Sequence, residues 1–481
     1  MGSQSKEIVL GIDVGTSGAR ALAATADGEV LAEAQIAVAD SLADGARNEQ
    51  DPQAWWRAVC TAAKRALKKL DDVTSPYAIG GLAVTSTSGS LVLADAEGQP
   101  VRHAILYDDS RGAADAEDLN RRLPGEAAQF NSSFSLVKAV WVRREEPATW
   151  DRVRHLLHPA DWLTGMLAGQ FGITDESHAL KLGYDIEAGT WGTAVTLAGI
   201  PADMLPRVVR PGTPVGTISR QAGEETGLRP GTPVLGGATD GIASLIASGA
   251  CERGDANTTL GTTLVWKVLS ETKPRLAAGM YCHHHPGGWW APGAASHTGP
   301  GSLRTEGTDL APAEMDRLAA GHLPSSHLCY LLRSQGERFP FLNPQAETFF
   351  EGNPATPAES HAAQMQSLSF VERWGYERLE ECGVAVGDAV FSTGSAAASP
   401  TLSQLRANVL KREVHRTRYP TAAFGAALLA AAESLFGGDL KSAMRRMTQV
   451  SESYRQRPEA ARAFEEIYAR FRAACARRGY L

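Results

Sequence analysis

The sequence predicts an α/β protein built from two domains. A single hydrophobic core stops growing at about 250–300 residues, and this chain has 481 residues. Short apolar strands alternate with helices, which is typical of layered α/β architectures. A strand–turn–strand motif, with a turn rich in glycine, threonine and serine, occurs once in each half. This repetition indicates an internal duplication, and we place the boundary between the domains near residue 253.

The composition excludes several classes of protein. Hydrophobic residues make up 43% of the chain and charged residues 21%, which are proportions of an ordinary globular protein rather than of a disordered or coiled-coil one. The net charge of -7 argues against a nucleic-acid binder. No apolar run reaches the ~18–20 residues of a membrane span, and six scattered cysteines without a CxxC pair are typical of reduced proteins. We therefore expect a cytoplasmic protein with no nucleic-acid or membrane partner.

The first motif is a hairpin that could hold a phosphate. A strand over residues 7–12 leads to Asp13, a turn follows at residues 15–18, and a second strand covers residues 20–25. Such a turn directs N–H groups and hydroxyls into one concavity, and the aspartate can hold Mg²⁺ through water. Because the glycines lie in a hairpin and do not open a helix, a Walker loop and a dinucleotide fingerprint are excluded. A plain β-turn with an exposed aspartate is the alternative.

The same pattern returns in the second half. Gly261, Thr262 and Thr263 separate two strands over residues 257–260 and 264–269. A further strand at residues 389–393 is followed by Gly394 and Ser395. Two such loops, facing each other across a cleft, would grip a polyphosphate from both sides.

Asp240 is the candidate general base. It follows an apolar strand that begins near residue 233, and it precedes a helix of small residues at 242–249. A carboxylate at a strand end beside a cleft can accept the proton of a hydroxyl, and the positive end of the helix dipole favours its ionised form. The alternative is a helix cap, because aspartate is common at that position.

The order and spacing of these motifs resemble the FGGY family of carbohydrate kinases, within the actin/hexokinase-like ATPase superfamily. The resemblance covers residues 7–471 and implies two ribonuclease H-like domains with a central cleft. It also implies that residues 1–253 bind the sugar and residues 254–481 the nucleotide. The motifs are residues 11–17 (GIDVGTS), 107–111 (YDDSR), 138–141 (KAVW), 161–165 (DWLTG), 185–191 (DIEAGTW), 240–241 (DG), 260–263 (LGTT) and 423–427 (AFGAA).

Within the family, the chain is most similar to the D-ribulose kinases of cyanobacteria and plants, which are xylulose kinase-like. Four stretches carry this similarity: residues 15–20 (GTSGAR), 88–89 (SG), 178–184 (HALKLGY) and 336–340 (GERFP). Xylulose kinases usually have Met-His where this chain has Thr87-Ser88, which favours ribulose. The resemblance thus implies ATP-dependent conversion of D-ribulose to D-ribulose 5-phosphate. D-xylulose, or another pentose or polyol, is the alternative substrate.

The resemblance also implies roles for individual residues. Asp240 matches the catalytic base, and Asp13 matches the aspartate that holds Mg²⁺, through water, and touches the substrate. The implied ATP-binding residues are Thr16, Ser17, Gly261, Thr262, Thr263, Gly394 and Ser395. The implied sugar-binding residues are Asp13, Gly18, Arg20, Ser88, Asp109 and Asp240. The implied cofactors are ATP and Mg²⁺, and we expect a monomer or a homodimer.

Three positions in the second half depart from the family pattern. The Gly-Gly-Gly adenosine motif is replaced by residues 394–396 (GSA), the glutamate before Ala-Ala-Phe/Leu-Gly by Thr421, and the Asn-x-Gly-Gly stretch by residues 297–300 (HTGP). All three belong to the nucleotide side. A non-catalytic sugar or nucleotide sensor derived from the kinase fold is therefore the alternative to an enzyme. The intact pair of Asp13 and Asp240 favours the enzyme.

Overall fold

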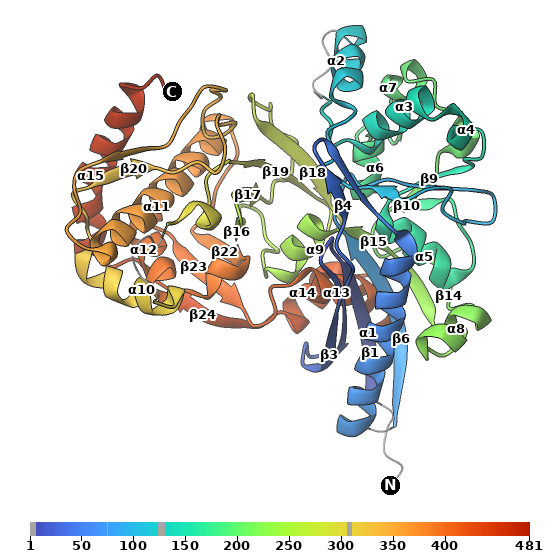
Figure 1. The fold of residues 1–481 in the computed structure, drawn as a ribbon. Coiled ribbons are helices and arrows are strands. Elements are labelled where there is room, and N and C mark those ends of the chain that lie inside the picture. Colours follow the sequence, from blue (N-terminus) through green and yellow to red (C-terminus); the bar gives the residue numbers. More distant parts are fainter. Residues whose placement is uncertain (1–5, 75, 124–129, 305–309) are drawn as a thin grey trace. The chain divides into compact units, whose positions relative to one another are not determined.

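The computed structural model describes residues 6–74, 76–123, 130–304 and 310–481. The chain forms two compact units, and each combines a mixed sheet with helices (Figure 1). Unit 1 comprises Met1–Ala247 and Ala422–Met447, and unit 2 comprises Ser248–Thr421 and Thr448–Leu481. The prediction of an α/β fold with two domains is confirmed.

A six-stranded sheet in the order β14-β15-β6-β1-β2-β3 forms the centre of unit 1. Its strands are β1 (Lys6–Val14), β2 (Gly18–Thr25), β3 (Val30–Ala37), β6 (Tyr77–Ser86), β14 (Pro214–Thr217) and β15 (Pro233–Thr239). The neighbours β1, β6 and β15 are parallel, whereas β2, β3 and β14 pair antiparallel. Because parallel strands end at the same edge of a sheet, this trio brings three distant segments together.

Both faces of β1 are buried. Ile8, Leu10, Ile12 and Val14 belong to one hydrophobic core together with Trp55 of helix α1 (Pro52–Val73). That helix begins where its sequence predicts, since the side chain of Asp51 accepts a hydrogen bond from Gln53 N–H at 3.0 Å and proline occupies the first turn. The alternate residues of β1 face the other side of the sheet.

The remaining elements of unit 1 surround this sheet. The other helices are α2 (Ala113–Arg122), α3 (Ser135–Glu145), α4 (Pro147–Trp150), α5 (Pro159–Ala168), α6 (Glu176–Ala179), α7 (Thr193–Leu197), α8 (Arg220–Thr226) and α9 (Asp240–Ala247). Small sheets pair β4 (Leu42–Asp44), β5 (Arg47–Gln50) and β8 (Ala104–Ile105), then β7 (Val92–Ala94) with β9 (His155–Leu157), β10 (Ile173–Asp175) with β13 (Arg207–Val209), and β11 (Tyr184–Asp185) with β12 (Thr190–Trp191).

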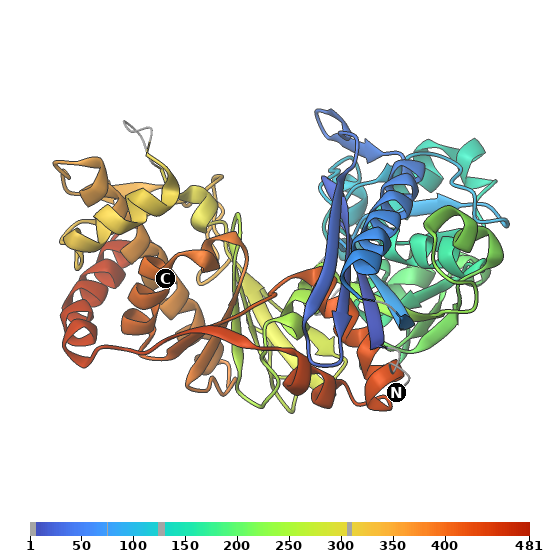
Figure 2. The ribbon, with the colours of Figure 1, turned by 90° about the horizontal axis from the view of Figure 1, so that it is seen from below.

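A late segment of the chain returns to unit 1. Helices α13 (Ala422–Phe436) and α14 (Leu440–Met447) pack beside the N-terminal strands, where they are drawn in orange-red (Figure 2). The close approach depends on two glycines: a Cβ on Gly11 would lie 1.8 Å from Ala423 O, and one on Gly425 would lie 1.9 Å from Ala243 O. Residues 422–447 thus belong to unit 1 by their contacts, since their apolar faces are buried there, whereas the sequence predicted a single boundary near residue 253.

The central strands of unit 2 repeat the arrangement of those in unit 1, with a hairpin followed by two parallel strands. Its seven-stranded sheet has the order β18-β19-β17-β16-β22-β23-β24, with β16, β22 and β23 parallel and the flanking pairs antiparallel. The strands are β16 (Ala256–Leu260), β17 (Leu264–Val268), β18 (Met280–His285), β19 (Trp289–Ala295), β22 (Ala389–Thr393), β23 (Glu413–Thr417) and β24 (Val450–Tyr454). The β16–β17 hairpin thus corresponds to the β1–β2 hairpin, as an internal duplication predicts.

Helices α11 (Pro357–Glu381), α12 (Pro400–Leu410) and α15 (Pro458–Ala476) enclose the core of unit 2. The last helix docks through one apolar face, on which Phe464, Tyr468 and Phe471 are buried. The segment that precedes α11 contains α10 (Pro312–Ala319), β20 (Leu328–Tyr330) and β21 (Phe349–Glu351).

In the described ranges no single helix is long and apolar enough to cross a membrane. Only α13 and α14 together meet that criterion, and they are bent by 112° with respect to each other.

Replacing Gly425 by valine should detach or distort α13. The added side chain has no room against the backbone of Ala243, and forced overpacking costs about 1–3 kcal/mol. We expect a clear fall in Tm in thermal denaturation. Gly321→Ala is the control, because nothing lies within 4 Å of the Cβ position at that glycine. An equal Tm for both variants would contradict the tight docking of α13.

Candidate active site

Three neighbouring strand ends in unit 1 carry the polar side chains of the candidate site. Asp13, the penultimate residue of β1, pairs with Thr85 of β6. Ser86, the last residue of β6, pairs with Thr239 of β15. Asp240 follows directly and opens α9, as the sequence predicts. The two predicted catalytic aspartates therefore lie at one edge of the sheet with a single strand between their own.

The charges of these two carboxylates influence each other. The pKa of Asp13 is raised to about 7, mainly by burial and next by the charge of Asp240. The charge of Arg20 opposes both effects. Arg20 lies opposite Asp13 in the β1–β2 pair and contacts Glu33 and Gln35 of β3, with N–O distances of 3.2 and 3.1 Å. At neutral pH Asp13 is thus poised between its two protonation states.

The first predicted phosphate loop is a tight hairpin turn. Gly15 N–H donates to Gly18 O at 3.0 Å, and Val38 N–H donates to Ser17 O at 3.1 Å. Thr16 and Ser17 are exposed, so their hydroxyls and N–H groups are accessible to a ligand. Gln50 fixes the turn, because its Nε2 donates to Thr16 O at 2.9 Å.

Ser88 follows β6, the strand between those of the two aspartates, and Tyr107 lies near Asp240. Ser88 is half-buried in the turn that follows β6. Tyr107 is 41% exposed, and burial together with the charges of Asp108 and Asp240 raises the pKa of its hydroxyl. The phenol of Tyr107 is thus a neutral hydrogen-bonding group close to Asp240.

Asp109 is placed differently from the other predicted sugar-binding residues. Its side chain is 2% exposed, and Oδ2 accepts hydrogen bonds from Asn48 N–H at 2.8 Å and Arg111 Nη2 at 2.7 Å. Arg111 also contacts the buried Glu49. The carboxylate of Asp109 therefore holds together a buried ionic cluster at the edge of β5.

A buried lysine lies next to this region. Lys138 Nζ donates to the carbonyl oxygens of Tyr107, at 3.3 Å, and of Ser132. Burial lowers the pKa of Lys138 to about 7, Lys181 adds to this effect, and Asp109 and Asp108 oppose it. Lys138 thereby supports the main chain at Tyr107 from the core side.

Two buried histidine–aspartate pairs underlie the strand ends, and the sequence interpretation gave them no role. His158 bonds Asp161 and Ser135, and His178 bonds Asp175 and Ser86. The histidine rings lie 5.1 Å apart between centroids. The signal in the sequence is that His and Asp lie three positions apart in each pair. The histidine comes first in one pair, and the aspartate comes first in the other.

Asp175 and His178 form an ion pair in the core. Burial alone would lower the pKa of His178, but the charge and hydrogen bond of Asp175 outweigh it and raise this pKa to about 9. Ligand atoms of Asp161, Asp175 and His178 lie within 4.8 Å of one another. Both ring nitrogens of His178 already have hydrogen-bond partners. The cluster is therefore a hydrogen-bonded support rather than an open metal site.

In unit 2, the structure brings the predicted nucleotide residues together at another pair of strand ends. Thr262 is exposed at the tip of the β16–β17 hairpin, between Gly261 and Thr263. Gly394 follows β22 with φ +87°, and a Cβ there would lie 2.5 Å from Leu260 O. Ser395, also exposed, opens a short 3-10 helix. Glycine is thus required where this turn crosses the end of β16.

A fully buried ion pair supports these two strands from below. Arg406 donates from Nε and Nη2 to the carboxylate oxygens of Glu372, each at 2.7 Å, and from Nη1 to Ser392 Oγ of β22 at 2.7 Å. Thr258 Oγ1 of β16 donates to Glu372 at 2.6 Å. One guanidinium–carboxylate pair therefore fixes β16 to β22 just before their loops.

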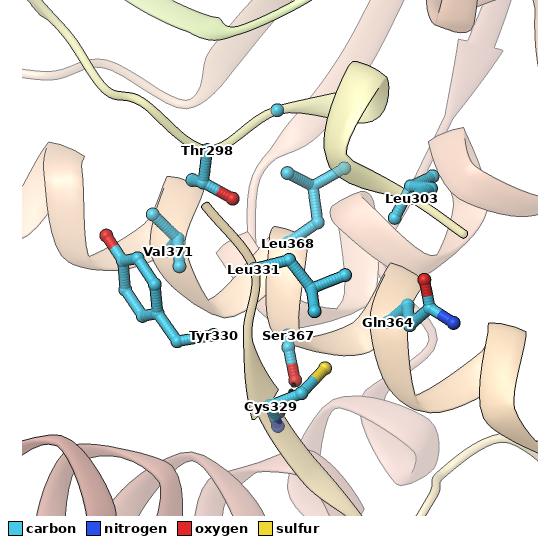
Figure 3. A pocket seen from close by; sticks show the side chains of 10 residues that line it. Thr298, Leu303, Cys329, Tyr330, Leu331, Gln364, Ser367, Leu368 and Val371 are labelled. Atoms are coloured by element: carbon cyan, nitrogen blue, oxygen red, sulfur yellow. Dashed lines mark hydrogen bonds between the residues drawn. The ribbon is translucent and has the colours of Figure 1, made fainter. Parts of the chain in front are cut away.

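A small cavity lies beneath the Thr298–Gly299 segment of unit 2. Figure 3 shows its lining, in which Ser367 Oγ accepts a hydrogen bond from Cys329 N–H at 3.1 Å. Its volume of about 10 Å³ equals the space of one water molecule. It is too small for a sugar or a nucleotide, which need about 300 Å³ or more.

Comparisons with known proteins agree with this architecture. The model of the FGGY family of carbohydrate kinases, N-terminal domain, matches residues 8–247, and the C-terminal domain model matches residues 256–434. The xylulose kinase of Escherichia coli K12 is 26% identical over 436 residues, covering 88% of this chain and 89% of the relative.

Solved structures resemble the whole chain. The xylulose kinase from Rhodospirillum rubrum has a TM-score of 0.86 and 25% identity, and the match covers 98% of both chains. Plasmodium falciparum glycerol kinase with ADP has a TM-score of 0.87, 16% identity and the same coverage, which indicates the shared fold alone. Since the two domain models together match most of its length, the chain belongs to the FGGY family of carbohydrate kinases.

Proposed function

We propose that this carbohydrate kinase phosphorylates a ketopentose, D-ribulose first of all, with Asp240 as general base. The observation that carries the proposal is the position of Asp13 and Asp240 at the ends of two parallel strands on either side of β6, where their charges interact. Enzymes concentrate such perturbed carboxylates where proton transfer occurs. The scattered cysteines further support a cytoplasmic enzyme.

In the proposed reaction Asp240 takes the proton of a sugar hydroxyl. The hydroxyl oxygen then forms a bond to the γ-phosphorus of ATP, and ADP leaves with the electron pair of the broken bond. Asp240 is half-buried at the start of α9, where the helix dipole favours its ionised form. Tyr107, Ser88 and Arg20 offer the neighbouring hydrogen-bonding groups for the sugar.

We propose that Asp13 holds Mg²⁺ through water. A half-buried carboxylate beside a second carboxylate is costly to ionise, and a divalent cation removes that cost. The ion would neutralise charge on the phosphates. The exposed groups of residues 16–17 suit one end of the polyphosphate, and those of residues 261–263 and 394–395 suit ATP in unit 2.

The choice of sugar rests on different observations for the two candidates. Thr87-Ser88 in place of Met-His, together with the stretch at residues 178–184, favours D-ribulose. D-xylulose is favoured by the name of relatives that are 24–27% identical, such as the E. coli enzyme. Proteins of one fold can discriminate sugars by a few side chains. We therefore rank D-ribulose first, on residues 87–88 and 178–184.

Asp240→Ala should lower kcat by ~10²–10⁴-fold, because a positioned general base contributes about that factor. The measurement is ADP release coupled to a dye or NADH readout, with saturating ATP·Mg and sugar. Asp439→Ala is the matched control: Asp439 also accepts a helix N-terminal N–H, that of Ser442 at 3.1 Å, but lies at α14. If both variants kept full turnover, Asp240 would be only a helix cap.

Asp13→Asn should stabilise the cation-free protein, and more so at high pH. Folding raises the pKa of Asp13 from 3.8 to about 7, so between these values the folded protein holds a proton that the unfolded chain has released. The wild type therefore loses stability as the pH rises through this window, and asparagine removes the loss. We expect the gain in Tm to grow from pH 5 to pH 8, with the exposed Asp44→Asn as control. A gain that stays constant with pH would contradict the raised pKa.

A panel of ketoses and polyols should give the highest kcat/KM for D-ribulose, with D-xylulose second. Turnover only on D-xylulose would reverse the ranking and leave the kinase assignment intact. Calorimetry with ATP·Mg and each sugar covers the sensor alternative: tight sugar binding without nucleotide binding at millimolar concentration, and without turnover, would favour a sensor over an enzyme.

A further inference from the structure

We propose that Ser177 and Asp175 are positioning residues for Asp240, acting through the backbone of Thr239. The inference rests on the proposed function, since it says that a buried hydrogen-bond network at α6 orients the proposed base. Four side chains carry it: Asp175, Ser177 and His178 around α6, and Ser86 at the end of β6. Each is at most 2% exposed.

The first link joins α6 to the last residue of β15. Thr239 N–H donates to Ser177 Oγ at 2.8 Å. The partner strand β14 reaches only as far as Leu235 in its pairing with β15, so among the described residues no strand pairs with the outer side of Thr239. A side-chain hydroxyl thus completes the sheet edge at the residue that precedes Asp240.

The second link fixes that hydroxyl. Ser177 Oγ donates to Asp175 Oδ1 at 2.6 Å, and the same oxygen accepts from Ser177 N–H at 2.8 Å. Asp175 is the N-cap of α6, so its carboxylate cannot rotate without uncapping the helix. Because the hydroxyl proton is committed to Asp175, the oxygen lone pairs point to Thr239 N–H.

The third link closes the arrangement on the other side of β15. Asp175 Oδ2 bonds His178 Nδ1, and His178 Nε2 bonds Ser86 Oγ at 3.1 Å. Ser86 is the cross-strand partner of Thr239. The carboxylate of Asp175 therefore acts on both sides of Thr239, through Ser177 and through Ser86. The main chain that orients Asp240 has little freedom as a result.

The neighbouring pair of His158 and Asp161 supplies a matched control. It has the same chemistry and burial, but its histidine bonds Ser135 Oγ of α3, at 3.0 Å. Ser135 and Ser177 are both buried hydroxyls in a His–Asp network, and only Ser177 bonds the strand end before Asp240. Removing either hydroxyl should lower the stability of the protein by a similar amount. Only the removal of the Ser177 hydroxyl should change the position of Asp240.

The test compares Ser177→Ala, Ser177→Thr and Ser135→Ala in steady-state kinetics and thermal denaturation. We expect Ser177→Ala to lower kcat by ~10-fold or more, because small misplacements of a reacting group are costly, while the KM for ATP changes by less than about twofold. Ser177→Thr, which keeps the hydroxyl, should restore most of kcat. Ser135→Ala should keep kcat within about twofold of the wild type at a similar loss of Tm.

Equal kcat values for Ser177→Ala and Ser135→Ala would overturn the inference, as would a loss in Ser177→Ala that threonine does not rescue. If Ser177→Ala fails to fold, Asp175→Asn replaces it in the test. We then expect a lowered kcat at an unchanged KM for ATP, and an unchanged kcat would contradict the inference. The result for Asp240→Ala distinguishes a failure of the proposed function from a failure of the positioning role. Full turnover there removes the proposed base itself, whereas lost turnover there with normal kcat in Ser177→Ala removes only the positioning role.

Discussion

Everything proposed for this chain depends on bringing two carboxylates to one edge of a parallel sheet. Asp13 and Asp240 are separated by most of unit 1 in sequence, yet β1, β6 and β15 run parallel and end together. Burial, and after it the charge of Asp240, raises the pKa of Asp13 to about 7, so the ionised form of Asp13 destabilises the folded state. A fold keeps such an arrangement at the expense of stability when the site needs it.

The rest of unit 1 supports this edge by packing and by hydrogen bonds. Helix α13 comes close to β1 at Gly11 and to α9 at Gly425, because neither glycine presents a side chain to its neighbour. At the edge itself, Gln50 holds the first loop and Ser177 holds the end of β15. Unit 2 uses a different device for its own loops, since Arg406 and Glu372 tie β16 to β22 as a buried ion pair. In each unit, the exposed groups that we propose to bind ligand follow buried strands.

The sequence predicted the features that depend on local patterns. Hairpin turns, the capped start of α1 at Asp51 and the position of Asp240 between strand and helix follow from spacing and residue type, and the structure has them. The repeated hairpin also predicted the common topology of the two sheets. Long-range pairings could not be predicted in this way. No local signal places residues 422–447 in unit 1, bonds Ser177 to Thr239 sixty-two positions away, or bonds Asp109 to Asn48 sixty-one positions away.

The coupling of Asp13 with Asp240 can be measured directly. Carbon-13 NMR titration of the aspartate carboxyls, in the cation-free wild type and in Asp240→Asn, reports the pKa of Asp13 with and without its neighbour's charge. Our account predicts a pKa of about 7 in the wild type and a lower value in the variant. A wild-type pKa near the ordinary value of 3.8, or the same raised pKa in both proteins, would contradict it.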